Sequence, residues 1–329
     1  MNWGTLGHEW AVQLLREQLI QGRSKQAYLF TGPPGIGRRT LALALAQAVN
    51  CLQPPEPATP CLTCRSCQQF KTMKHPDLSV IQADQVGAVL KVEQIREMQH
   101  RLALAPYEAR FKIALLLRFE EAHASAANAL LKTLEEPPAR VILLLTAQDT
   151  ESVLPTIASR CEVIRLRPMP FAQVSAGLQT GWEIPSDQAR LLGHISGGRP
   201  GYALRLSRSE ELLEQRQGWL EDLSHLLTSR RVARFAYAET VTKDKNLSLA
   251  DLLQTWLTYW RDILILTTRA DSPLANIDRQ AEIEQLASNT TLQTARKVIQ
   301  AVERTLQLLA KNVNPRLAME VLMLELPYY

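Results

Sequence analysis

The first half of the chain alternates short apolar runs with longer stretches of helical periodicity. Five runs of four to six residues are rich in Leu, Ile, Val and Ala: 27–31, 78–81, 113–117, 141–146 and 162–166. Apolar runs of this length, separated by helical stretches, are typical of a parallel sheet flanked by helices. We therefore expect an α/β fold, with helices at 40–49 and 125–136, the second ending at Pro137-Pro138.

The second half shows helical periodicity only. Pro168-Met169-Pro170 follows the last apolar run as a plausible linker, and a small helical stretch with a glycine-rich turn at 197–201 follows it. From Glu210 onward apolar residues recur at helical spacing, which is far more often a helix core than a cofactor site. The pattern predicts three domains: an α/β domain over 1–167, a helical lid over 168–208 and an all-α domain over 209–329.

A glycine-rich loop follows the first predicted strand. Gly32, Gly35 and Gly37 have the spacing of a phosphate-binding loop, in which backbone N–H groups cradle phosphates, a lysine reaches them and a hydroxyl holds magnesium. Here Arg38 stands at the lysine position and Arg39 at the hydroxyl position. Thr40 comes one residue late, about 100° around a helix. We expect a turn kept for its shape that does not bind ATP, although the glycine N–H groups leave anion binding open.

A second ATPase feature is also missing. The apolar run 113–117 should end in an acid that binds magnesium, but Leu117 stands there and Arg118 follows in place of a catalytic glutamate. Glu120 and Glu121 lie past the strand end, and we interpret them as a solvated helix start rather than as substitutes. No intrinsic ATPase activity is therefore expected.

Four of the five cysteines fall within seventeen positions: Cys51, Cys61, Cys64 and Cys67. Four thiolates suffice for a closed tetrahedral Zn²⁺ site of the structural kind, which would staple the loop after the first helix. An iron–sulfur cluster is a weaker alternative, since the spacing after the third cysteine does not match. Free buried cysteines are the plain alternative. A zinc ribbon that contacts nucleic acid has only Arg65 and the lysines of 71–74 to support it.

Arg160 lies in the tripeptide Ser159-Arg160-Cys161, between a predicted short helix and the fifth strand. An arginine at such an edge could leave its own domain and stabilise charge on a phosphate held by a neighbour, as arginine fingers do. A surface arginine paired with a carboxylate is the ordinary alternative.

Composition excludes several classes of protein. The chain of 329 residues is 46% hydrophobic and 21% charged, with a net charge of +4, which is typical of a globular protein and only weakly suggests DNA contact. Residues 1–5 lack the features of a signal peptide, and no run is long enough to span a membrane. We expect a cytoplasmic protein with reduced cysteines.

Together these motifs resemble the delta-prime (δ′) family of bacterial DNA polymerase III clamp-loader subunits, within the AAA+ class. The resemblance covers roughly the first two hundred residues. It rests on 27–35, the four-cysteine insertion, the run 128–138 (NALLKTLEEPP) and Ser159-Arg160-Cys161, in that order. The helical remainder agrees only in length and class.

The resemblance implies an AAA+ domain, a small lid and a C-terminal helical collar that joins ring subunits. It further implies a noncatalytic subunit of the polymerase complex that assembles with motor and delta subunits to load a sliding clamp on primed DNA. Arg160 would be the finger for an adjacent motor. Pro200-Gly201 stands where motor subunits place a nucleotide-binding arginine. The alternatives are a divergent ATP-binding gamma/tau-like motor subunit and a zinc-dependent nucleic-acid protein outside replication.

Overall fold

The computed structural model describes residues 3–244, 247–310 and 313–329. Residues 1 and 2, part of the segment used above to exclude a signal peptide, lie outside the described part. The chain forms two compact units: Met1–Gly177 with Gly198–Tyr202, and Leu178–Gly197 with Ala203–Tyr329. The segment 168–208 contributes to both units, so its assignment as a separate lid stays a prediction.

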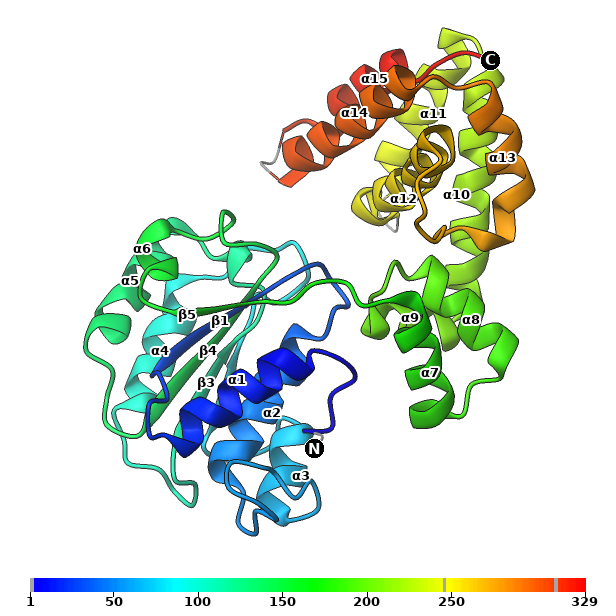
Figure 1. Ribbon diagram of the computed structural model, residues 1–329. Coiled ribbons are helices and arrows are strands. Elements are labelled where there is room, and N and C mark those ends of the chain that lie inside the picture. Colours follow the sequence, from blue (N-terminus) through cyan, green and yellow to red (C-terminus); the bar gives the residue numbers. More distant parts are fainter. Residues whose placement is uncertain (1–2, 245–246, 311–312) are drawn as a thin grey trace. The chain divides into compact units, whose positions relative to one another are not determined.

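The first unit is built on a five-stranded parallel sheet with the order β2-β3-β4-β1-β5 (Figure 1). The strands are β1 Ala27–Thr31, β2 Leu78–Ile81, β3 Lys112–Leu116, β4 Val141–Ala147 and β5 Glu162–Arg165. All five predicted strands are confirmed within about one residue at each end. The apolar runs made this prediction possible because a parallel sheet covered on both faces buries nearly every side chain of its central strands.

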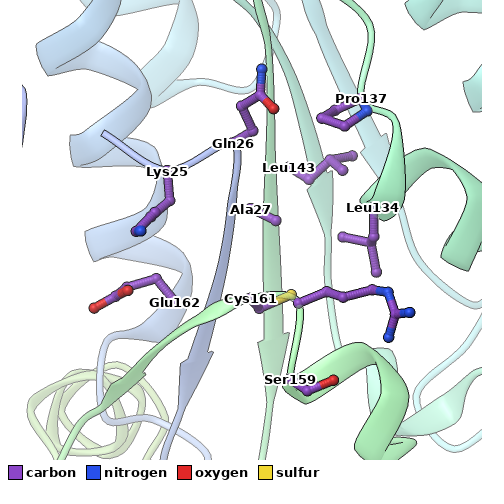
Figure 2. Close-up of a pocket in the computed structure, with 10 residues that line it drawn as sticks. Lys25, Gln26, Ala27, Leu134, Pro137, Leu143, Ser159, Cys161 and Glu162 are labelled. Atoms are coloured by element: carbon purple, nitrogen blue, oxygen red, sulfur yellow. The ribbon is translucent and has the colours of Figure 1, made fainter. Parts of the chain in front are cut away.

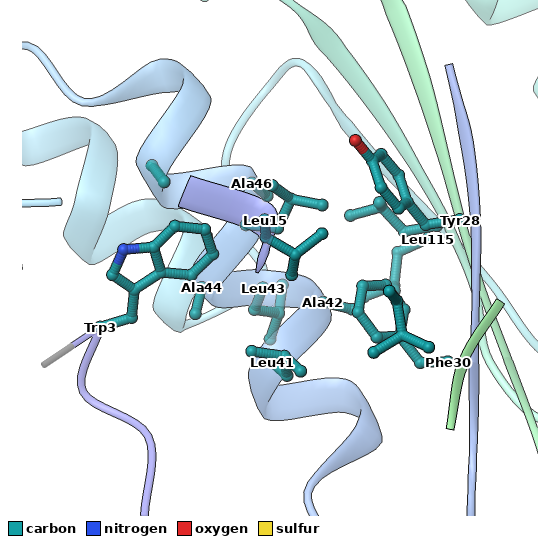
Figure 3. Close-up of a cluster of buried hydrophobic side chains, with 14 of the residues drawn as sticks. Trp3, Leu15, Tyr28, Phe30, Leu41, Ala42, Leu43, Ala44, Ala46 and Leu115 are labelled. Atoms are coloured by element: carbon teal, nitrogen blue, oxygen red, sulfur yellow. The ribbon is translucent and has the colours of Figure 1, made fainter. Parts of the chain in front are cut away.

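Helices cover both faces of the sheet, with α1 and α2 on one face and α4 and α5 on the other (Figure 1). The helices of this unit are α1 Glu9–Ile20, α2 Arg38–Asn50, α3 Arg65–Lys71, α4 Val92–Leu102, α5 Ala124–Glu135 and α6 Pro155–Ala158, with a 3₁₀ turn η1 at Phe119–Glu121. Because side chains alternate along a strand, Tyr28 and Phe30 face α1 and α2, whereas Leu29 faces α4 and α5. Figure 3 shows the first of these clusters, which contains Leu15 of α1 and Leu41 of α2 together with the Tyr28 and Phe30 rings of β1.

The rest of the chain is helical, as its periodicity predicted. Its helices are α7 Phe171–Trp182, α8 Ser186–Ile195, α9 Pro200–Ser207, α10 Glu210–Thr228, α11 Arg231–Lys243, α12 Leu249–Thr268, α13 Gln280–Ser288, α14 Leu292–Ala310 and α15 Pro315–Glu325, with a 3₁₀ turn η2 at Ile277–Arg279. Trp256 and Trp260 of α12 are fully buried, which confirms the interpretation of the apolar stripe as helix core. The α/β fold with an all-α C-terminal region, as expected of the AAA+ class, is confirmed.

Buried polar side chains fix the ends of several helices in the second unit. The Arg234 guanidinium of α11 donates to the carbonyl oxygens of Leu226, Met323, Leu326 and Pro327, at 2.5–3.2 Å. These bonds join the C-terminal ends of α10 and α15, where helical carbonyl groups lack partners within their own helix, to α11. Arg234 therefore holds α15 in a defined orientation against α11.

None of the helices in the described ranges is long and apolar enough to cross a membrane.

Candidate functional site: a glycine loop, a cysteine cluster and an edge arginine

The glycine loop connects β1 to α2 and needs its glycines for shape. Gly32, Gly35 and Gly37 have φ angles of 145°, 82° and 112°, a region that side chains with a Cβ rarely occupy. A Cβ on Gly32 would lie 2.5 Å from the carbonyl oxygen of Leu166. The shape of the loop therefore requires glycine at these positions.

Neighbouring segments pack directly on this loop. The backbone N–H of Gly201, at the start of α9, donates to the carbonyl oxygen of Gly35 at 2.8 Å. A Cβ on Gly35 would come within 2.8 Å of the Tyr202 nitrogen. On another side, His8 Nε2 lies 3.0 Å from the carbonyl oxygen of Ile36. The loop is thus held by a backbone hydrogen bond from Gly201 and by a side-chain contact from His8.

Arg38, the first residue of α2, pairs with Glu120 of η1. Its Nη1 lies 3.9 Å from Glu120 Oε1, and the two side chains are only 11% and 14% exposed. Burial lowers the pKa of Arg38 although Glu120 opposes this, and burial raises the pKa of Glu120 although Arg38 opposes that. The side chain at the lysine position of the loop is therefore engaged by a carboxylate of the same chain.

The prediction that Glu120 and Glu121 form a solvated helix start is wrong. They do lie on a short helical turn, but Glu121 accepts two bonds from Arg118 Nε at 2.9 and 3.0 Å, and each glutamate side chain is less than 15% exposed. Arg118 adopts a left-handed φ of 49° and donates its backbone N–H to Thr146 Oγ1, which turns its side chain back toward Glu121. Glu121 is therefore hydrogen-bonded by Arg118, and Glu120 lies beside Arg38 at ion-pair distance.

Leu117 occupies the position where an ATPase has its magnesium-binding acid, and it is buried in the core at 5% exposure. Its backbone N–H extends the strand pairing by donating to the carbonyl oxygen of Ile81 at 2.8 Å. Arg39 and Thr40, the next two residues of the loop motif, are exposed on the first turn of α2.

The structure brings the four predicted cysteines together. All Sγ atoms of Cys51, Cys61, Cys64 and Cys67 lie within 4.8 Å of one another. Four sulfur ligands about 2.3 Å from a shared Zn²⁺ would lie about 3.8 Å apart, so the cluster fits a tetrahedral site. Cys51 directly follows α2 and Cys64 caps the N-terminus of α3. Two helix ends therefore supply the cluster.

The cysteines of the cluster differ in how their surroundings shift the pKa of the thiol. Burial raises the pKa of the Cys51 and Cys67 thiols. Burial also tends to raise the pKa of Cys61, but hydrogen bonds from Cys64 and Thr63 outweigh it and bring that pKa to about 6. A metal ion would supply the positive charge needed to keep all four sulfurs deprotonated. The cluster lies at the opposite end of α2 from the glycine loop, about 20 Å away along a helix of thirteen residues.

Arg160 lies at the amino-terminal end of the strands, whereas the glycine loop follows the carboxyl-terminal end of β1. β5 pairs with β1 in the register Glu162 to Tyr28, so Arg160 is level with Gln26, six residues before Gly32. At about 3.3 Å per strand residue this corresponds to about 20 Å. Arg160 therefore does not contribute to its own glycine loop.

Arg160 borders a pocket of about 290 Å³ at the amino-terminal edge of the sheet. Figure 2 shows residues that line the pocket, among them Lys25, Gln26, Leu134, Leu143 and Glu162. The Arg160 side chain is 37% exposed and pairs with Glu135, its Nη2 lying 2.6 Å from Glu135 Oε1. The ordinary alternative considered for this arginine, pairing with a carboxylate, is thus realised in the isolated chain.

Sequence reasoning missed two partners of the predicted site residues. Glu135 was part of the run 128–138, but nothing in that run indicated that it reaches Arg160. Glu120 was named and given the wrong environment. The spacing did correctly predict that the four cysteines would meet, whereas the glycine loop, the cysteine cluster and Arg160 form three separate places in the first unit.

Comparisons with known proteins identify the family of the chain. Residues 7–170 match the family model described as DNA polymerase III, delta subunit, and residues 210–327 match the model of its C-terminal part. The chain is 30% identical to DNA polymerase III subunit delta′ of Bacillus subtilis over 319 residues, which cover 96% of this chain and 94% of the relative. It is 34% identical to the delta′ subunit of Pseudomonas aeruginosa over 67% of each chain.

Tau and gamma/tau subunits match this chain over only part of their own length; the gamma/tau subunit of Mycobacterium tuberculosis is 28% identical over residues that cover 96% of this chain and 59% of that protein. The tau subunit of Escherichia coli DNA polymerase III is 35% identical over 174 residues, which cover 53% of this chain and 26% of that protein. By contrast, the delta′ relative from Bacillus subtilis matches along almost its whole length. The chain therefore belongs to the delta-prime subunit family of DNA polymerase III.

Proposed function

We propose that this chain is a noncatalytic delta-prime-like subunit of the DNA polymerase III clamp loader. Arg160 would act in trans as an arginine finger at the ATP site of a neighbouring motor subunit while a sliding clamp is loaded onto primed DNA. The observation that carries this proposal is the position of Arg160, partly exposed and about 20 Å from its own glycine loop. An arginine so placed can contact a phosphate only on another molecule.

The state of the chain's own loop supports the noncatalytic role. Magnesium at this place requires an acid at the end of β3, and Leu117 is buried there. The Arg38 guanidinium is buried and lies 3.9 Å from the Glu120 carboxylate, which balances part of the charge that a lysine would otherwise offer to a β- or γ-phosphate. We infer that ATP does not bind productively to this loop.

We further propose that Cys51, Cys61, Cys64 and Cys67 hold a structural Zn²⁺. The cluster offers four sulfurs and no open position for a substrate, in line with the closed coordination of structural sites. Gln47 of α2 donates to the carbonyl oxygen of Cys67 at 2.8 Å. The ion would thus join the end of α2 to α3 and would take no part in ATP hydrolysis.

The C-terminal helices are proposed to form the collar that joins this chain to the motor and delta subunits. Leu317, Val321 and Leu324 lie at helical spacing on α15 and are 57%, 40% and 54% exposed, so they form an apolar stripe facing solvent. The charged neighbours Arg316 and Glu320 pair with each other at 2.8 Å. Because these charges pair within α15, the exposed apolar stripe is available to pack against a helix of a partner subunit. We place the assembly in the cytoplasm.

The test is ATP turnover by a complex reconstituted from this chain and the ATPase subunits of its own organism. Arg160→Ala should leave assembly intact and slow hydrolysis at the adjacent site by up to about 10³-fold. Arg110→Ala is the matched control, because Arg110 is exposed before β3 at the same edge of the sheet. An unchanged rate for Arg160→Ala would exclude the finger.

A binding experiment separates this proposal from the motor alternative. The purified chain is titrated with a fluorescent ATP analogue, with and without magnesium. We expect no saturable binding. Tight, magnesium-dependent binding would show that Arg38 and Arg39 are compensated and that the chain is itself a motor subunit.

A further inference from the structure

The guanidinium of Arg160 is held at two points by two different helices. Its Nη2 donates to Glu135 Oε1 at 2.6 Å, and its Nη1 donates to the carbonyl oxygen of Thr156 at 2.9 Å. Glu135 is the last residue of α5, and Thr156 lies on the short helix α6. These two contacts fix both the position and the plane of the guanidinium.

The remaining donors of Arg160 are available to a ligand. A guanidinium has five N–H groups, and these two contacts use one on each terminal nitrogen. The side chain is 37% exposed, so the other N–H groups can reach an anion that arrives from solvent. Charge-assisted bonds of this kind to phosphate oxygens are short and directional, and they require the guanidinium to be correctly oriented.

Glu135 is itself delivered by a rigid element. Leu130 and Leu134 of the same helix are buried in the core beneath the sheet, at 0% and 8% exposure. Glu136 ends the helix and Pro137 follows, so the chain turns away directly after Glu135. The carboxylate therefore stands at a fixed place beside Arg160 while remaining 51% exposed itself.

We propose that Glu135 is a positioning residue for the arginine finger. It holds the Arg160 guanidinium in the orientation in which its free N–H groups meet the γ-phosphate of a nucleotide bound to the neighbouring subunit. This inference rests on the proposed function of Arg160. Glu135 itself does not touch the nucleotide and acts only through the arginine.

The physical basis is preorganisation. A free arginine side chain has many rotamers, and orienting it only at the moment of reaction lowers the rate. A half-exposed ion pair is screened by water, so its contribution corresponds to a factor of up to about 5. Because the finger acts on charge that develops in the transition state, the effect should fall on kcat and leave KM for ATP unchanged.

The experiment uses the complete reconstituted complex. The ATP sites that do not border this chain are inactivated by substitution, so that only the ATP site beside this chain turns over. We expect Glu135→Ala to lower kcat about 5-fold with KM for ATP within 2-fold of wild type. Glu135→Gln keeps an oxygen that accepts the Nη2 bond and should lose no more than about 2-fold. Glu136→Ala is the matched control at the next exposed position and should not change kcat.

The variant Arg160→Ala/Glu135→Ala separates this inference from the proposed function. If Glu135 acts through Arg160, its removal should change nothing further once Arg160 is absent. A kcat for Glu135→Ala equal to wild type, while Arg160→Ala is slow, would overturn the positioning role alone. A rise in kcat for both Glu135 variants would also overturn it, because Glu135 would then restrain the finger. If Arg160→Ala has no effect, both the proposed function and this inference fail.

Discussion

The buried pair of Arg38 and Glu120 gives the sharpest test of how the degenerate glycine loop is stabilised. Two unit charges 3.9 Å apart attract by about 1 kcal/mol in water and by about 4 kcal/mol at an effective dielectric of 20. Desolvation nevertheless lowers the pKa of Arg38 and raises that of Glu120. For each group burial therefore outweighs attraction, so the pair adds little net stability although each member needs the other.

We expect a double-mutant cycle to show this asymmetry. Glu120→Gln leaves a buried cation without its carboxylate and should lower the free energy of unfolding by about 1–3 kcal/mol. Arg38→Met should cost a similar amount, because Glu120 is then buried alone. The variant that carries both changes should lie within about 1 kcal/mol of wild type, so the coupling energy between the two sites should be at least about 1 kcal/mol.

Because the chain has two compact units, the measurement must report on the first unit alone. All five residues of β1 are buried, so hydrogen exchange of their backbone amides reports the stability of that unit. Additive effects of the two single changes would refute the reasoning. They would mean that both charges are solvated, as the sequence had suggested for Glu120.

Three further predictions concern the metal, the collar and pH. Cys67→Ser, or chelation of the metal, should destabilise the first unit by several kcal/mol, because a structural zinc contributes to folding. Thermal melting is measured together with metal content, and Cys161→Ser, which removes a thiol outside the cluster, is the control. Unaltered melting after the metal is gone would contradict the site. Leu324→Asp on α15 should weaken incorporation into the complex about 10-fold, as for one apolar interface residue, whereas Leu104→Asp, at an exposed leucine in the first unit, should not; equal incorporation in a pull-down would exclude the stripe. Burial raises the pKa of Glu120 in the folded state, so the native state binds more protons than the unfolded state, and the contribution of Glu120 to stability falls as pH rises from about 4.5 through the raised pKa. The urea midpoint of wild type should therefore fall with pH more steeply than the midpoint of Glu120→Gln over this range. Identical pH dependence of the two midpoints would argue against the raised pKa.

Much of the fold could be predicted from local patterns. The five strands are apolar runs flanked by turn and helix residues, and the structure places them within about one residue of the expected ends. The expected glycine turn is present, because positive φ at Gly32 and Gly35 is a requirement of the backbone itself, whereas the loss of ATP binding stays a prediction. The cysteines could be predicted to meet because four of them fall within seventeen positions.

The environment of charged side chains could not be predicted in the same way. Glu120 follows a strand at a position where helix starts are usually solvated, but Arg38, eighty-two residues earlier, lies beside it and both are covered. Arg160 was identified from its tripeptide, but its partner Glu135 is twenty-five residues away on another helix. No local pattern specifies such pairs, because they depend on which strand ends and helix ends come together.

The sequence by itself determined the strands, the helical second half, the shape of the glycine loop, the loss of the ATPase side chains and the meeting of the cysteines. Each of these depends on residue types at short spacing, where backbone geometry and hydrophobic periodicity act directly. The tertiary structure alone decided that Arg38 is engaged by Glu120 and that Arg160 stands at the amino-terminal end of the strands, held by Glu135. Solvation and pairing of charges are set by strand order and helix packing, which join residues far apart in the chain.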